Sequence, residues 1–258
     1  MKIEQVAAQL YTLRDHLNTS EQIRKTLRQV RKIGYQAVQI SGIGPVDPKE
    51  LASILDGEGL QCCATHENAQ VILETPEAVV EKLSILGCLH TAYPYPADVD
   101  FSSMRALKAF VKQLDAAGAV LRAGGKTLSY HNHDIEFRRV RDHLILEFIY
   151  DNTNPDHLKA ELDTHWVQAG GANTAAWCRR LSGRMPLIHL KDYAIDADRR
   201  RRFAEVGSGN MDWTGIIAAA DAAGCRWFIV EQDGDWVNND PFKSLKLSFR
   251  YLKDMASG

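Results

Sequence analysis

The chain has 258 residues, of which 45% are hydrophobic and 25% are charged, and its formal net charge is −2. This balance is that of a globular protein with a sizeable core. A nucleic-acid-binding protein usually has a basic footprint, which this chain lacks, so we expect no nucleic acid partner. No run of sequence approaches the roughly 18 apolar residues of a membrane helix, so we expect no membrane partner.

The cysteines indicate a reducing environment. They are odd in number, lie within apolar runs and form no C-x-x-C pair, which predicts reduced core thiols rather than disulfides. They are Cys62, Cys63, Cys88, Cys178 and Cys225. The apolar stretch within residues 1–14 is too short and too polar for a signal peptide, so we expect a cytoplasmic protein.

Short apolar runs alternate with longer amphipathic stretches along the whole chain. The apolar runs predict eight strands, which in chain order are Gln5–Leu10, Ala37–Ile40, Leu60–His66, Cys88–Tyr93, Lys126–His133, Leu158–Asp163, Pro186–Lys191 and Trp227–Glu231. The amphipathic stretches predict helices at Ser20–Lys32, Pro48–Asp56, Pro76–Leu86, Met104–Arg122, Trp213–Ala223 and Phe242–Met255. Glycines mark several helix-to-strand joints, as expected for helix C-terminal caps.

Strands that alternate with helices of this length predict a parallel sheet with helical crossovers. An open doubly wound sheet usually has a glycine-rich phosphate-binding turn after its first strand, but residues 11–14 contain no glycine. Eight units in about 250 residues suit a (β/α)8 TIM barrel, which we predict as a single domain over residues 1–258. The basic run Arg199–Arg202 is interpreted as a solvated loop, with an anion site as the alternative.

The C-terminal ends of the last four strands carry polar residues where a barrel fold has its active site. Side chains alternate faces along a strand. If the apolar Tyr130, Leu162, Ile188, Leu190 and Val230 face outward, one ionisable residue from each strand faces inward. The inward residues are then His131, Asp163, His189 and Glu231. Two imidazoles and two carboxylates suit one divalent Mn, Co, Zn or Fe ion and leave coordination positions for substrate.

Two residues beyond each of these ligands lies another ionisable side chain on the same predicted face: His133, His165, Lys191 and Asp233. This second tier would lie above the metal, beside bound substrate. Simpler interpretations exist for single residues: Asp163 could cap the next segment, Glu231 could pair with a lysine, and Lys191 could form a surface ion pair with Asp192. The four strands together favour a functional site, because burying such a cluster without a ligand is costly.

At these residues the chain resembles the xylose isomerase-like barrel superfamily, in particular the sugar phosphate isomerases/epimerases. The resemblance covers essentially the whole chain and includes residues 9–11 and His66. Its motifs are YHNHDIEF (130–137), ELDTHW (161–166), HLKD (189–192), EVGSG followed by DW (205–213) and VEQDG (230–234).

The resemblance implies a metal on the four predicted ligands and substrate-lining roles for His66, Gln9 and Trp166. It also implies that the glycine loop at residues 207–209 lets backbone approach the ligand, with a simple tight turn as the alternative.

The chain departs from the better-known epimerases of the family at one predicted ligand. Those enzymes have glutamate where this chain has His131, and that glutamate is one of their two acid/base groups. His133 matches the histidine that dehydratase or lyase relatives use as general base, and Glu136 is a substitute ligand or base. The two-glutamate epimerase mechanism is therefore in doubt.

The sequence thus predicts a metal-dependent sugar isomerase/epimerase that removes a proton α to a carbonyl of a small sugar substrate. The main alternative is a dehydratase or lyase acting on a keto-sugar, keto-glycoside or cyclitol at the same metal site. A non-catalytic sugar-binding barrel is less favoured, because such a protein needs no base beside the metal. A DNA-repair endonuclease, which the fold family includes, is disfavoured by the charge.

Overall fold

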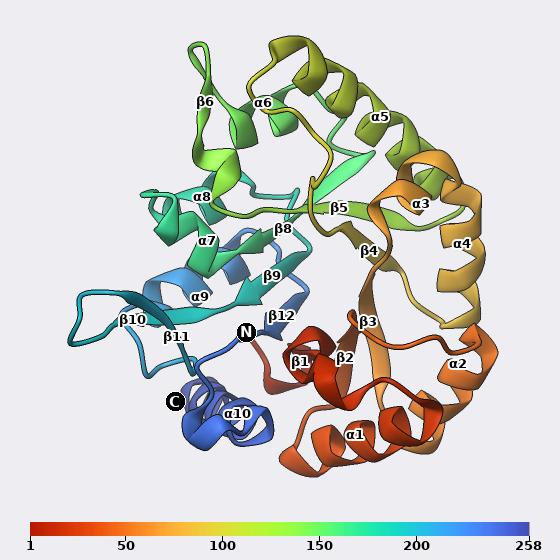
Figure 1. The fold of residues 1–258 in the computed structure, drawn as a ribbon, viewed down its shortest axis with the longest axis vertical. Coiled ribbons are helices and arrows are strands. Elements are labelled where there is room, and N and C mark those ends of the chain that lie inside the picture. Colours follow the sequence, from red (N-terminus) through yellow and green to blue (C-terminus); the bar gives the residue numbers. More distant parts are fainter. Residues whose placement is uncertain (258) are drawn as a thin grey trace.

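Eight parallel strands close into a barrel in the computed structural model, which describes residues 1–257 (Figure 1). The strand order around the barrel is β1-β12-β9-β8-β5-β4-β3-β2. The strands are β1 (Val6–Gln9), β2 (Ala37–Ile40), β3 (Gln61–His66), β4 (His90–Tyr93), β5 (Thr127–His131), β8 (Leu158–Asp163), β9 (Leu187–Leu190) and β12 (Trp227–Val230). The predicted (β/α)8 TIM barrel is therefore confirmed.

Helices surround the barrel and connect successive strands (Figure 1). They are α1 (Ser20–Ile33), α2 (Pro48–Gly57), α3 (Ala69–Glu74), α4 (Pro76–Ile85), α5 (Met104–Ala123), α6 (Ile145–Asp151), α7 (Thr164–Ala169), α8 (Thr174–Arg180), α9 (Trp213–Ala222) and α10 (Pro241–Ser257). The six predicted helices occur within two residues of their predicted ends. The short helices α3, α6, α7 and α8 were not predicted, since each has only six or seven residues and too few turns for a periodic pattern.

Local signals set the ends of these helices. The Thr19 side chain accepts a hydrogen bond from the backbone of Gln22 at the start of α1, and Ser103 does the same for Ala106 at the start of α5. Gly34 ends α1 with φ of 130°, and the space that a Cβ would need there is filled by the Phe249 ring. Glycine is therefore required at this position both for its backbone angle and for packing.

The two faces of the barrel strands carry different side chains. The outward residues Tyr130, Leu162, Ile188 and Val230 are buried in the layer between strands and helices, as the alternation predicted. A smaller apolar cluster forms a separate plug inside the barrel and consists of Ala7, Ala37, Cys63, Ala64, Leu187 and Ile229. On β9 and β12 these plug residues come two positions before His189 and Glu231. The plug therefore closes the interior below the polar ends of the strands.

Two small hairpins project outside the barrel. One pairs β6 (Arg139–Val140) with β7 (His143–Leu144), and the other pairs β10 (Asp192–Ile195) with β11 (Arg201–Ala204) (Figure 1). Residues 199–202 are exposed on the second hairpin, consistent with the solvated segment expected there. All five cysteines are buried and free. None of the described helices is both long enough and apolar enough to cross a membrane.

Candidate active site

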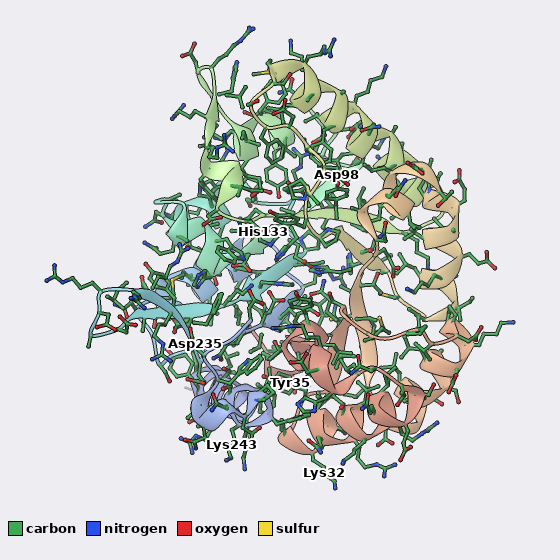
Figure 2. The ribbon with its side chains drawn as sticks, in the orientation of Figure 1. Lys32, Tyr35, Asp98, His133, Asp235 and Lys243 are labelled. Carbon is green, nitrogen blue, oxygen red and sulfur yellow. The ribbon has the colours of Figure 1, made fainter. Side chains whose placement is uncertain are left out.

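A cavity of about 450 Å³ opens at the C-terminal ends of the strands. Its walls include His66, His131, His133, Lys191, Glu231 and Asp233. Figure 2 places His133 at the inner ends of the strands rather than among the surrounding helices. The cavity thus occupies the position where a barrel enzyme binds its substrate.

The four residues predicted as metal ligands come together beneath this cavity. Their ligand atoms all lie within 4.8 Å of one another, and we call His131, Asp163, His189 and Glu231 the upper set. The parallel pairing of the strands brings these residues to similar heights in the barrel. Asp163 is in register with His189. Ile229 is also in register with His189, and Glu231 follows Ile229 by two residues. Each of the four is at most 4% exposed.

The upper set fits a divalent cation. Asp163 Oδ2 is buried and accepts no hydrogen bond from residues 1–257. It lies 3.9 Å from His131 Nε2 and 4.0 Å from His189 Nδ1. His189 Nδ1 in turn lies 3.0 Å from Glu231 Oε2. Two imidazoles and two carboxylates that converge in this way are a suitable donor set for a transition metal.

Sequence reasoning missed Glu161, which is completely buried one level below Asp163 on β8. Its Oε1 lies 2.5 Å from His66 Nε2 and 3.2 Å from both His131 Nδ1 and His189 Nε2. We call His66, His131, Glu161 and His189 the lower set, whose ligand atoms also lie within 4.8 Å of one another. The signal was available, because Glu161 and Asp163 have the same parity on one strand.

Glutamine side chains complete the layer below. Gln39 Nε2 donates to Glu161 Oε2 at 2.6 Å, and Gln9 Nε2 donates to Gln39 Oε1 at 2.9 Å. Gln9 is fully buried and is absent from the cavity wall, so the structure places it beneath the site rather than beside substrate. The predicted substrate-lining residue His66, in contrast, lies at the cavity wall.

Charges in the buried layer strongly perturb its pKa values. Burial raises the pKa of Asp163 to about 6, although Lys191 and His189 oppose the shift. Burial also acts against ionised Glu161 and Glu231, but neighbouring imidazoles, and Lys191 for Glu231, hold both pKa values well below their ordinary range. Burial disfavours charge on His189, yet Glu161 and Glu231 raise its pKa to about 10. Burial lowers the pKa of His131, the other histidine common to both sets, to about 3, so only His189 of these two favours the charged form.

Lys191 and Asp233, predicted for the second tier, reach the same cavity. The Lys191 ammonium lies 2.7 Å from Asp233 Oδ2, 2.8 Å from Glu231 Oε2 and 3.4 Å from Asp163 Oδ2. Lys191 is only 2% exposed. The alternative of a surface ion pair between Lys191 and Asp192 therefore does not describe this lysine.

His133 stands beside the upper set without belonging to it. Its ring centroid lies 4.9 Å from those of His131 and Tyr95, and 5.5 Å from that of Trp166. Burial lowers the pKa of His133 to about 2, and positive charge on His131 and Lys191 acts in the same direction. The imidazole is therefore neutral at physiological pH.

His165 does not reach the cavity, whereas the Trp166 ring lies beside Lys191. His165 is buried, its Nδ1 lies 3.3 Å from the Asp192 carbonyl oxygen, and it is absent from the cavity wall. Its predicted inward position fails because β8 ends at Asp163 and α7 begins at Thr164, where side chains no longer alternate. The Trp166 ring is nearer the site, with its centroid 5.2 Å from Lys191 Nζ.

Glu136, considered as a substitute ligand or base, is buried outside the cavity wall. One of its oxygens accepts a hydrogen bond from the Tyr130 hydroxyl at 2.7 Å, and the other accepts one from the His133 backbone at 2.8 Å. Tyr130 faces outward into the helix layer. Glu136 thus ties the end of β5 to the outer layer.

The glycine loop after β11 wraps around a carboxylate. Asp192 Oδ2 accepts hydrogen bonds from the backbone of Gly207 and Gly209, each at 3.0 Å, and from Trp213 Nε1 at 2.7 Å. A Cβ on Gly209 would lie 2.2 Å from the Tyr193 carbonyl oxygen. The tight-turn interpretation therefore describes this loop, and its glycines allow close approach to Asp192.

Comparison with known proteins agrees with this architecture. Residues 27–255 match the family described as xylose isomerase-like TIM barrel. The chain belongs to this family. No curated protein is similar enough to the chain to match it.

Several solved structures share the fold with this family member. A sugar phosphate isomerase/epimerase from Parabacteroides distasonis is 23% identical with a TM-score of 0.82, and the match covers 96% of this chain and 93% of that one. L-ribulose 3-epimerase is 16% identical with a TM-score of 0.75, over 100% of this chain and 96% of that one. The 3-keto-D-glucoside 4-epimerase from E. coli is 16% identical with a TM-score of 0.67, over 97% and 99% of the two chains.

Proposed function

We propose that the protein is a metal-dependent enzyme of the sugar isomerase/epimerase type. It would remove a proton α to a carbonyl of a sugar or sugar derivative and form an enediolate. One observation carries the proposal: ligands from β5, β8, β9 and β12 converge beneath a cavity that also holds a neutral histidine and a buried lysine. The solved structures named as sugar epimerases give the substrate class its support.

The upper set would hold one divalent ion, which is Mn, Co, Zn or Fe. When bound, the ion polarises the substrate carbonyl and so acidifies the neighbouring C–H. Its four protein ligands lie below the cavity, so substrate approaches from the cavity side.

Two residues of this chain would move or stabilise the charge. The His133 ring borders the cavity 4.9 Å from the His131 ring, so its position beside the upper set would allow it to take the proton from carbon. The Lys191 ammonium reaches the same cavity and would stabilise the negative charge that develops on the substrate oxygen. His66 and Asp233 would orient the sugar, and Trp166 would pack against Lys191 beside the cavity. Gln9, His165 and Glu136 would act through packing and hydrogen bonds beneath or outside the cavity.

A dehydratase or lyase is the second candidate, and His131 favours it. An epimerase that works with two carboxylates needs an acid/base group on each face of the sugar. In this chain the β5 position holds an imidazole within the upper set, so Glu231 has no carboxylate counterpart there. Epimerisation needs a second group to return a proton to the opposite face of the carbon. Elimination needs only one base at carbon, because the enediolate then loses the β-leaving group instead of taking up a proton.

Further features of the proposal follow from bulk properties. The substrate is a small molecule, and the net charge of −2 disfavours nucleic acid as a partner. The five free, buried cysteines support a cytoplasmic location. We treat residues 1–258 as one domain, because the barrel strands span residues 6 to 230 and α10 packs against the first strand.

Proton NMR in D2O tests the proposal. The purified protein is supplied in turn with Mn, Co, Zn or Fe and mixed with keto-sugars and 3-keto-glycosides. Deuterium at the α-carbon with a new stereoisomer supports an epimerase, and an unsaturated product supports a lyase. If the sugar signals stay unchanged with every metal while Mn binding to the upper set is demonstrated, the alternative of a non-catalytic sugar-binding barrel is favoured.

A further inference from the structure

We propose that the lower set is a second cation position, used in alternation with the upper set. The two sets share His131 and His189 and differ in their remaining ligands. His66 and Glu161 belong only to the lower set, whereas Asp163 and Glu231 belong only to the upper set. This inference concerns where ions bind and does not depend on the reaction proposed above.

The spacing around Glu161 suits coordination. His131 Nδ1 and His189 Nε2 both lie 3.2 Å from Glu161 Oε1. His131 Nδ1 is buried and has no hydrogen-bond partner among residues 1–257, so the 3.2 Å contact leaves this nitrogen unsatisfied. Ligands that bind one ion at about 2.0–2.2 Å are themselves separated by about 3.0–3.6 Å. An ion would therefore satisfy a buried nitrogen that the protein alone does not.

The other two contacts can adjust to an ion. His66 Nε2 is 2.5 Å from Glu161 Oε1, so its ring must move outward by roughly an ångström to make room at ordinary metal–ligand distances. His66 borders the cavity, and its Nδ1 has only a 3.4 Å contact with Ser41 Oγ. His189 Nε2 now contacts Gln39 Oε1 at 2.6 Å, and that oxygen keeps Gln9 Nε2 as a donor if the contact is lost.

The shared histidines explain why the two sets alternate. His131 directs Nδ1 to Glu161 and Nε2 towards Asp163. His189 directs Nε2 to Glu161 and Nδ1 to Glu231. A neutral imidazole has one lone pair and one N–H, so each ring can bind an ion on one side only. The N–H then faces a carboxylate of the other set, an arrangement that commonly orients metal-binding histidines.

The donor atoms indicate which ions each set takes. The lower set offers three imidazoles and one carboxylate, and the upper set offers two of each. Imidazole favours Zn²⁺ and the later transition metals, whereas carboxylate favours Mn²⁺. We therefore expect Zn²⁺ in the lower set and Mn²⁺ in the upper set. Zinc in the lower set would occupy His131 and His189, so these two histidines could not bind Mn²⁺ in the upper set at the same time.

Variants of the unshared ligands separate the two positions. Loss of an orienting contact alone costs about 10–100-fold in metal affinity, so Asp163→Asn should weaken Mn²⁺ binding at least that much. The same variant should still bind one equivalent of Zn²⁺ in equilibrium dialysis. The double variant His66→Ala/Asp163→Asn should lose that zinc. Circular dichroism checks that each variant is folded.

Anomalous diffraction from wild-type and Asp163→Asn crystals soaked in Zn²⁺ locates the ion independently. A zinc peak among His66, His131, Glu161 and His189 in either crystal supports the proposal. It is overturned if folded Asp163→Asn binds no more zinc than the double variant and wild-type zinc lies only at the upper set. That result leaves the proposed function intact, whereas a wild-type protein that binds none of Mn, Co, Zn and Fe at the upper set refutes the function instead.

Discussion

The ammonium of Lys191 lies 2.8 Å from Oε2 of Glu231, a carboxylate of the upper set. Both side chains are nearly fully buried. Burial alone disfavours the charged lysine, but Asp163, Glu231 and Asp233 raise its pKa well above the ordinary value. Lys191 therefore stays protonated. It contacts Glu231 and Asp163, the two carboxylates that would also bind a metal ion in the upper set.

Replacing Lys191 with Met should separate metal binding from turnover. Mn²⁺ affinity should rise, because the variant frees Glu231 and Asp163 and removes a positive charge near the ion. Turnover should fall by about 10²–10³-fold if the ammonium stabilises the developing oxyanion. Titration calorimetry and the rate of α-deuterium exchange measure the two effects. Lys246→Met, on the exposed face of α10, is the matched control. Weaker Mn²⁺ binding in Lys191→Met would argue that the lysine organises the ligands.

His133→Asn should remove the base and keep the metal. The ring borders the cavity but belongs to neither ligand set. Loss of a general base typically lowers a rate by about 10²–10⁴-fold. Metal content by atomic absorption and solvent deuterium exchange are measured on the same samples, with the exposed His143→Asn as control. Near-normal exchange in His133→Asn would transfer the role of base to Glu231.

The fold could be predicted because its signals are local and repeated. Apolar runs of four to six residues alternate with amphipathic helices, and glycines such as Gly34 end the helices. The two hairpins β6–β7 and β10–β11 have no such repetition. Each depends on pairing between short segments without a regular apolar pattern, which only the folded chain brings together.

The site was predictable as far as strand alternation extends. The four upper-set residues lie within regular strands or one residue beyond them, so period-two alternation places them correctly relative to one another. The same reasoning fails at His165, which lies in a helix. It also cannot place Glu136, whose direction depends on the turn after β5 and on the Tyr130 hydroxyl. Glu161 follows the alternation but was overlooked in favour of the last residue of its strand.

Asp192→Asn should destabilise the glycine loop at residues 207–209, whose backbone donates to this carboxylate. Asp192 Oδ2 accepts three hydrogen bonds, including those from Gly207 and Trp213, and an amide nitrogen in its place would confront those donors. Hydrogen bonds to charged groups contribute about 1.5–3 kcal/mol each, so the free energy of unfolding should fall by about 3 kcal/mol or more. Urea unfolding measures this, with the exposed Asp198→Asn as control. Equal midpoints for both variants would show that the loop is held by other contacts.

His90 is the first residue of β4 and lies at the opposite end of the barrel from the cavity. The side chain is 5% exposed, and its Nδ1 has no hydrogen-bond partner among residues 1–257. Burial lowers the pKa of His90 from 6.5 to about 4, with the charge on Arg226 acting in the same direction and Glu161 opposing it. The folded protein therefore favours the neutral ring more than the unfolded chain does.

This shift makes His90 a source of acid sensitivity. Above pH 6.5 the ring is neutral in both states and its contribution is fully present. As the pH falls towards 4, the unfolded chain binds a proton that the folded protein does not, so up to about 3 kcal/mol of stability is lost. His90→Leu should flatten the pH dependence of the urea midpoint between pH 6.5 and 4, relative to wild type, in metal-free buffer. The exposed His143→Leu should keep the wild-type slope, and since the active-site residues are common to all three proteins, their titrations cancel in the comparison. Identical slopes for His90→Leu and wild type would place the acid sensitivity in the active-site cluster instead.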